Sequence, residues 1–207
     1  SDRFVDEKGQ PKPAPLDFGL SAMFRDMNGD GHPDLYACND FQTPDRLWLN
    51  QGDGRFREVP RPMIRKFAFS SMGVDFGDLD RDGHLDYFTV EMSPRSHARR
   101  QRSMTGVNFI PNLPGRFDYR PEVPRNTLYR GNGDGSWSEL AEYAGVASTD
   151  WSWQPVFLDV DLDGFEDILI ASGAIHDVQD RDTLAAIQAS GRPAQAANVL
   201  SYPAFPS

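Results

Sequence analysis

The chain has 207 residues, of which 39% are hydrophobic and 25% are charged, and it carries a formal net charge of −10 at pH 7. A mean hydropathy of −0.56 and the lack of any run of about 18 apolar residues argue against a membrane-spanning helix. The acidic balance argues against nucleic acid as the main partner. A single cysteine, Cys38, excludes an internal disulfide, and we expect it to be a small buried residue.

Residues 1–16 are polar and rich in proline, which predicts an irregular lead-in. A strand is predicted over residues 18–24, and a short acidic loop follows it. The pattern of this loop occurs three times, over residues 26–34, 78–86 and 159–167, which we name the first, second and third acidic loops. Each loop has an oxygen-bearing side chain at its first, third, fifth and ninth positions and a glycine at its sixth.

The acidic loops have the composition of calcium sites. So many carboxylates in one short loop repel one another unless a cation lies among them, and hard oxygen ligands suit calcium. The glycine allows a sharp turn with positive φ. The seventh residue would offer its backbone carbonyl, so the type of its side chain is expected to matter little. The predicted ligands are Asp26, Asn28, Asp30, His32 and Asp34 in the first loop, Asp78, Asp80, Asp82, His84 and Asp86 in the second, and Asp159, Asp161, Asp163, Phe165 and Asp167 in the third.

Two other interpretations of the loops are less well supported. An Asx-rich turn without metal is one alternative, but the spacing is repeated three times. An EF-hand begins in the same way, but it needs a glutamate at its twelfth position and flanking helices. Residue twelve is Ala37, Thr89 and Ile170 in the three loops, and the flanks resemble strands. The predicted unit is therefore strand, calcium loop, strand, with about three Ca²⁺ ions in a structural rather than a catalytic role.

A β-hairpin is predicted over residues 47–59, where alternating apolar residues surround a Gly-Asp-Gly turn, and again over residues 128–140. Loops and hairpins together give a repeat of about 52 residues, and residues 93–125 contain an insertion in the second copy. Four strands in a unit of this length are typical of a propeller blade. The predicted fold class is therefore all-β, a partial β-propeller of about three to four blades with DxDxDG loops between strands.

The Phe-Gly pair at residues 18–19, followed by the first acidic loop, resembles an FG-GAP (VCBS-type) repeat. The second hairpin, followed by Gly145-Val146, resembles the bacterial relatives of cartilage acidic protein, the ASPIC/UnbV-associated group. The resemblance implies a secreted or surface-exposed calcium-binding propeller, typically with seven blades, in which residues 17–175 form repeats. Residues 176–207 would then lead to a next blade, and a longer chain would supply the remaining blades.

The insertion at residues 93–125 contains seven arginines against two acidic residues. One interpretation is a basic patch for an anionic ligand such as a sulfated or uronic glycan. The other, which we favour, is a solvated excursion whose arginines pair with the acidic body. Later in the chain, a short helix is predicted over residues 183–189, with Asp180 or Asp182 as its cap.

Four tryptophans could stack on sugar rings, but core packing is the favoured prediction for all of them: Trp48, Trp137, Trp151 and Trp153. A catalytic pair of His176 and Asp177 is conceivable, although a single histidine in a loop is usually incidental. An enzyme site would also need Arg116, Tyr119 and Arg120 to lie near His176 in the fold.

The predicted function is that of a calcium-stabilised binding or adhesion module with a protein or glycan ligand. The loops lack the glutamate of tight calcium sites, and sites of modest affinity fill outside the cytosol, so a secreted, periplasmic or cell-surface location is expected. Two alternatives stay open. One is a lyase or hydrolase that acts on polysaccharides from a propeller scaffold, and the other is a scaffold domain of a larger enzyme.

Overall fold

The computed structural model describes most of the chain, and it is mostly β, as the sequence predicts. The described residues are 4–6, 8–11, 17–40, 43–60, 63–103, 121–191 and 202–204. Within them the strands gather into three principal sheets, each built around one acidic loop. We name these sheets 1, 2 and 3 after the first, second and third acidic loops.

Sheet 1 contains β2 (Gly19–Arg25), β3 (Asp34–Asn39), β4 (Arg46–Asn50) and β5 (Phe56–Glu58) in that order. Neighbouring strands of this series are antiparallel, and the short β1 (Phe4–Val5) adds to β5 in parallel. The first acidic loop joins β2 to β3, and β4 and β5 form the first predicted hairpin.

Sheet 2 repeats the same order with β7 (Gly73–Gly77), β8 (Asp86–Val90), β11 (Thr127–Gly131) and β12 (Trp137–Glu139). The second acidic loop joins β7 to β8, and β11 and β12 form the second predicted hairpin. The insertion separates β8 from β11, and there the short strand β10 (Glu122–Val123) pairs in parallel with β6 (Phe67–Ala68).

Sheet 3 is smaller. Its two main strands, β13 (Asp150–Leu158) and β14 (Asp167–Ser172), are antiparallel and are joined by the third acidic loop. The short β9 (Met92–Ser93) pairs with the beginning of β13, which gives the order β14-β13-β9. Among the described strands, therefore, β14 has a neighbour on one side only.

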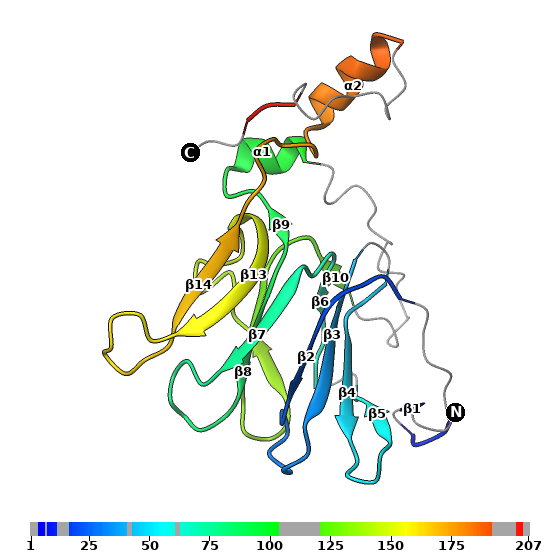
Figure 1. The fold of residues 1–207 in the computed structure, drawn as a ribbon, viewed down its shortest axis with the longest axis vertical. Helices are drawn as coiled ribbons and strands as arrows, with labels where there is room; N and C mark the ends of the chain where they lie inside the picture. Colours follow the sequence, from blue (N-terminus) through cyan, green and yellow to red (C-terminus); the bar gives the residue numbers. More distant parts are fainter. Residues whose placement is uncertain are drawn as a thin grey trace.

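The three sheets form a row in which their first strands are neighbours, with β7 between β2 and β13. All three acidic loops lie at the same end of the strands, while the helices lie at the other end (Figure 1). One aromatic core fills the space between sheets 1 and 2, where the Phe76 ring lies 5.9 Å from that of Tyr36. A second core includes Phe88 and Phe157 and joins sheets 2 and 3. The described sheets form an open row, and the propeller stays a prediction.

The predicted burial of Trp48, Trp137 and Cys38 is confirmed. For Trp153 the prediction of core packing is wrong, because its side chain is 48% exposed. Its indole stacks on that of Trp151 at 6.1 Å between ring centroids and donates a hydrogen bond to the carbonyl of Gly173 at 2.8 Å. The exposed ring results from the place of β13 in the last sheet of the row, where no described sheet covers its far side.

The insertion folds back onto the body through helix α1 (His97–Arg102). Arg99 reaches Asp150 at 2.9 Å and Asp177 at 3.1 Å, and Arg102 lies 3.7 Å from Asp180. Asp180 also caps helix α2 (Arg181–Ala189), where its carboxylate accepts the N–H of Thr183, so the predicted helix and cap are confirmed. Arg99 and Arg102 therefore pair with acidic residues of the body, as the favoured interpretation predicts, whereas Arg100 donates a hydrogen bond to Ser148. Residues 104–120, with Arg116, Tyr119 and Arg120, lie outside the described part.

Candidate metal centre

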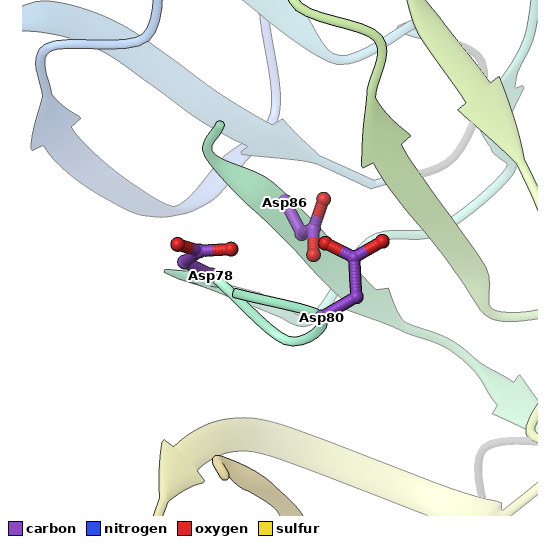
Figure 2. Close-up of side chains that lie close together, drawn as sticks. All are labelled: Asp78, Asp80 and Asp86. Atoms are coloured by element: carbon purple, nitrogen blue, oxygen red, sulfur yellow. The ribbon is translucent and has the colours of Figure 1, made fainter. Parts of the chain in front are cut away.

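The second acidic loop brings three carboxylates together at the start of β8. Asp78, Asp80 and Asp86 each offer one oxygen, and these oxygens all lie within 4.8 Å of one another (Figure 2). Asp78 follows β7 and Asp86 begins β8, so the two strands of the pair place the carboxylates on either side of the turn. A cluster of this kind is able to hold a metal ion.

The third acidic loop makes an equivalent cluster. Asp159, Asp161 and Asp167 place their carboxylate oxygens within the same limit of 4.8 Å. The first acidic loop does not bring three carboxylates together in this way, because its third residue is Asn28. There the Asn28 amide donates to the Asp30 carboxylate at 2.9 Å, so two side chains of the loop are hydrogen-bonded to each other.

The backbone of each acidic loop holds its carboxylates in the same orientation. The first aspartate accepts the N–H of the sixth residue, the fifth aspartate accepts that of the seventh, and the ninth accepts that of the second. The lengths of these bonds are 2.8, 2.9 and 2.9 Å in the first loop, 3.0, 2.9 and 3.0 Å in the second, and 2.9, 2.8 and 3.1 Å in the third. These bonds fix the side chains before any ion arrives, which is the kind of preorganisation that a metal site needs.

Two positions in each loop adopt a left-handed backbone. The sixth residue is the predicted glycine, with φ between 83° and 91°. The fourth residue is also left-handed, and sequence reasoning missed it because it is glycine only in the first loop. Arg81 (φ 58°) and Leu162 (φ 62°) occupy this position in the other two loops, where L-residues pay a strain of about 1–2 kcal/mol.

The donor set of the third loop fits a cation. One carboxylate oxygen of Asp159, Oδ1, is buried and has no hydrogen-bond donor, whereas Oδ2 accepts the N–H of Gly164. A buried charged oxygen without a partner is costly. A calcium ion held by Asp159, Asp161 and Asp167 would supply the missing partner and would neutralise their mutual repulsion.

The ninth aspartate of the first two loops also connects the loop to the hairpin of the same sheet. Asp34 accepts the N–H of Asn50 at 2.7 Å, and Asp86 accepts that of Gly131 at 2.9 Å. Both side chains are buried, and burial raises the pKa of each carboxyl, with these hydrogen bonds acting in the opposite direction. A bound cation would favour the ionised form of both groups.

The side chain at the seventh position contributes to packing, which corrects the prediction that its type matters little. The imidazole of His32 lies against Gly52 in the first hairpin turn, and that of His84 lies against Gly133 in the second. A Cβ at either glycine would overlap the ring. Glycine therefore allows this close approach of the ring, and the positive φ of the turn favours glycine as well.

The second and third loops also contact each other. Glu166 accepts the N–H of Asp78 at 3.0 Å, and the guanidinium of Arg81 lies 4.6 Å from the centroid of the Phe165 ring. Arg130, from the second hairpin, makes ion pairs with Asp80 and Asp82. The geometry of the second cluster therefore depends on residues of the third loop and of the second hairpin.

A cavity of about 250 Å³ lies between the first two loops and the second hairpin. Its lining includes Asp26, Asn28, Asp78, His84 and Asn132. At the opposite end of the sheets, the structure does not form the conceivable pair of His176 and Asp177. Instead Nδ1 of His176 lies 2.9 Å from the carbonyl of Tyr202, and Asp177 accepts hydrogen bonds from Arg99.

Comparison with known protein families matches two stretches of the chain, residues 26–89 and 119–170, to the FG-GAP-like repeat. These stretches cover more than half of the sequence and contain all three acidic loops, so the chain belongs to the FG-GAP-like repeat family. A comparison with curated proteins finds no match. The finer resemblance to the ASPIC/UnbV-associated group stays a prediction. Within the described residues, no helix is long and apolar enough to cross a membrane.

Proposed function

We propose that the chain is a calcium-stabilised module that binds a protein or glycan outside the cytosol. The observation that carries the proposal is the pair of carboxylate clusters in the second and third loops. An ion in each cluster neutralises three carboxylates and ties the two strands that the loop joins. Because the unfolded chain has no such site, the free energy of metal binding becomes free energy of folding. The calcium is structural, and its chemistry is charge neutralisation.

The proposed architecture is part of a β-propeller. Sheets 1 and 2 have the same strand order, their first strands are neighbours, and their acidic loops lie at one end. Repetition of this arrangement around an axis would give a ring, and further repeats would supply the remaining blades. In such a ring the loop ends form one face, on which the cavity between the first two loops is open to a ligand.

Two other classes of function remain as alternatives. A polysaccharide lyase or hydrolase would need a cluster of catalytic side chains, and His176 and Asp177 make their contacts with other partners. A scaffold domain of a larger enzyme would use the same calcium-stabilised sheets without a ligand of its own. Binding is favoured because the described cavity is lined by residues of the metal loops themselves.

The test is a calcium titration of the metal-stripped protein by calorimetry, together with thermal melts in calcium and in chelator. We expect the second and third loops to bind one ion each, the first loop to bind more weakly because Asn28 is neutral, and the melting temperature to rise strongly with calcium. Asp80→Asn and Asp161→Asn should each weaken one site. Asp53→Asn, in an exposed hairpin turn, is the matched control. No binding, or a melt that calcium does not change, would contradict the proposal.

A further inference from the structure

The second and third acidic loops are joined by a direct hydrogen bond. Glu166, the eighth residue of the third loop, accepts the N–H of Asp78 at 3.0 Å through its Oε2. Asp78 is the first predicted ligand of the second loop, and Glu166 stands between the seventh and ninth residues of the third, which are both predicted ligands. The eighth residue is Pro33 in the first loop and Leu85 in the second. Neither of these side chains can accept a hydrogen bond, so only the third loop can reach its neighbour in this way.

Two further features bring these loops together. Gly77 ends β7 just before the second loop, and a Cβ at this position would overlap the carboxylate of Glu166. In the opposite direction, Arg81 of the second loop reaches the third. Its guanidinium lies 4.6 Å from the centroid of the Phe165 ring and so close to Gly164 that a Cβ there would overlap it. Each loop therefore places one charged side chain against the predicted metal site of the other.

The first and second loops meet in a different way. A cavity of about 250 Å³ lies between them, and residues of both loops, such as Asp26 and Asp78, line it. In the part of the chain that the structure describes, no hydrogen bond joins the first loop to the second. An ion that orders one of these two loops therefore has no hydrogen bond through which to order the other.

We propose that the second and third loops bind their two cations cooperatively through Glu166 and Arg81, whereas the first loop binds independently. An ion in the third loop is held by residues on both sides of Glu166, so it fixes the backbone that carries this side chain. Glu166 then holds the N–H of Asp78, and part of the cost of ordering the second loop is met before its own ion binds. The effect is reciprocal by thermodynamic linkage. The inference rests on the proposed function, because it concerns the same calcium sites.

Charge acts against this coupling. Each of the two clusters has three carboxylates, and one Ca²⁺ leaves about one negative charge on a cluster, so the first ion weakens the electrostatic attraction for the second. Salt screens this opposing effect, with a Debye length of about 8 Å at 0.15 M, but it does not break the hydrogen bond of Glu166. The cooperativity should therefore be measurable at 0.15 M salt and should increase at higher ionic strength.

A calcium titration followed by NMR separates the three sites. The glycine at the sixth position of each loop donates its N–H to the first ligand, so the amides of Gly31, Gly83 and Gly164 report on the first, second and third loops. Asp159→Asn together with Asp161→Asn disables the third site and keeps the shape of both side chains. We expect the calcium midpoint at Gly83 to rise about fivefold or more in this double variant, with no change at Gly31. An unchanged midpoint at Gly83 would overturn the proposal.

Removal of Glu166 tests the route of the coupling. In the background of Glu166→Ala, the same two asparagine substitutions should move the midpoint at Gly83 by less than about twofold. Glu142→Ala removes an exposed glutamate outside the loops and is the matched control, which should keep the full effect. The full effect in Glu166→Ala would overturn the role assigned to this residue. If none of the three glycine amides responded to calcium, the proposed function itself would fail, and this outcome is distinct from sites that fill independently.

Discussion

The two ends of the sheets place their carboxyl groups in different environments. At the loop end, carboxylates of the second and third loops gather in threes, most of them exposed or half-buried, and backbone N–H groups hold them in place. At the helix end, several carboxyl groups are fully buried, and the described structure places no three of them around one point. Burial raises the pKa of Asp45 to about 6 and that of Glu91 to about 8. Asp150 and Asp177, at the same end, are paired with Arg99.

Acidic residues alone therefore do not define a metal site. A carboxylate that must leave water needs a cation, a proton or an arginine, and the packing around it decides which of these it receives. The loop end leaves room between converging oxygens, which suits an ion. The helix end surrounds each carboxyl with hydroxyl, amide or guanidinium donors, such as the Tyr36 hydroxyl at 2.7 Å from Asp45.

The largest effect is expected at the ninth aspartate. Asp86→Ala removes the acceptor for two backbone N–H groups, those of Leu79 and Gly131, inside the protein. We expect it to lower the free energy of unfolding by about 3 kcal/mol or more in calcium. Asp167→Ala is the matched variant, because it removes a ligand of the same kind from an exposed position with one donor. Each should lose one calcium site by calorimetry.

The difference between these two variants in urea unfolding is the informative quantity. Both lose the same kind of ion, so the extra loss in Asp86→Ala measures the burial of the carboxylate and its bond to the hairpin. Equal losses would mean that metal binding alone accounts for the role of the ninth residue. That outcome would remove the distinction between the second and third loops.

The loops, hairpins and helix cap could be predicted because each depends on residues close together in the sequence. Alternating apolar residues, a Gly-Asp-Gly turn and an acidic spacing are local patterns. The second and third carboxylate clusters follow from one loop each, so they too could be predicted from the sequence. The first acidic loop could also be predicted from its spacing. The hydrogen bond from the Asn28 amide to Asp30 could not, because it depends on the side-chain rotamers.

The helix end could not be predicted, because its properties depend on which distant segments meet. Glu91 is buried where Ser70, in the segment before β7, donates to its carboxylate and Asn126, just before β11, accepts its backbone N–H. Arg99 finds its partners in β13 and near α2, far along the chain. Trp153 was placed in the core by its alternation along the strand, but burial depends on whether another sheet covers that strand. No local pattern contains this information.

Glu91 should give the helix end its own pH dependence. Burial, with the nearby charges of Asp40 and Asp45 adding to it, raises the pKa of Glu91 to about 8, and its hydrogen bonds to Met92 and Ser70 act against that rise. The folded state therefore holds a proton that the unfolded state releases above pH about 4.5. The stabilisation from this group is complete below that pH and is lost as the pH rises to about 8, with a slope of up to about 1.4 kcal/mol per pH unit.

The measurement is urea unfolding of the wild type and of Glu91→Gln between pH 5.5 and 8.5 in saturating calcium. The proposed calcium sites respond to pH in the opposite direction, because their ligands must be ionised, but they are common to both proteins and cancel in the difference. Burial also raises the pKa of Asp45 to about 6 and that of Glu122 to about 7, and both groups remain in the variant. We therefore expect the decline with rising pH to be shallower in the variant than in the wild type. Parallel pH profiles would show that Glu91 is ionised in the folded protein, and that burial at this end is compensated in another way.

Arg99 tests the arginine pairs at the helix end. Its side chain bridges Asp150, which has a left-handed backbone (φ 64°), and Asp177, which is buried. Arg99→Ala leaves Asp177 without this cation and leaves Asp150 with the more exposed Arg95 at 3.7 Å. It should lower the free energy of unfolding by about 2 kcal/mol. Arg100→Ala, which removes a hydrogen bond to Ser148 at the exposed face of α1, is the matched control. If both variants lost little free energy of unfolding, and to the same extent, the ion pairs of α1 would contribute little to stability, as is usual for surface ion pairs.

The smallest effect is expected at Arg130, where an arginine pairs with carboxylates of an acidic loop. Its guanidinium pairs with Asp80, a member of the second carboxylate cluster, and with Asp82. A bound calcium ion competes with this cation for Asp80 and is repelled by its charge. Arg130→Gln should therefore raise the calcium affinity of the second loop severalfold at low ionic strength, and less in high salt, where exposed charges are screened.

The control for this change is Arg95→Gln, which removes an exposed arginine near Asp150 at the other end of the sheets. Calorimetric titration of both variants should show a change in affinity for Arg130→Gln alone. A fall in affinity would give Arg130 the opposite role, because the arginine would then position Asp80 for the ion. In that case an arginine would hold carboxylates in place at both ends of the sheets. The two ends would then differ only in how deeply their carboxylates are buried.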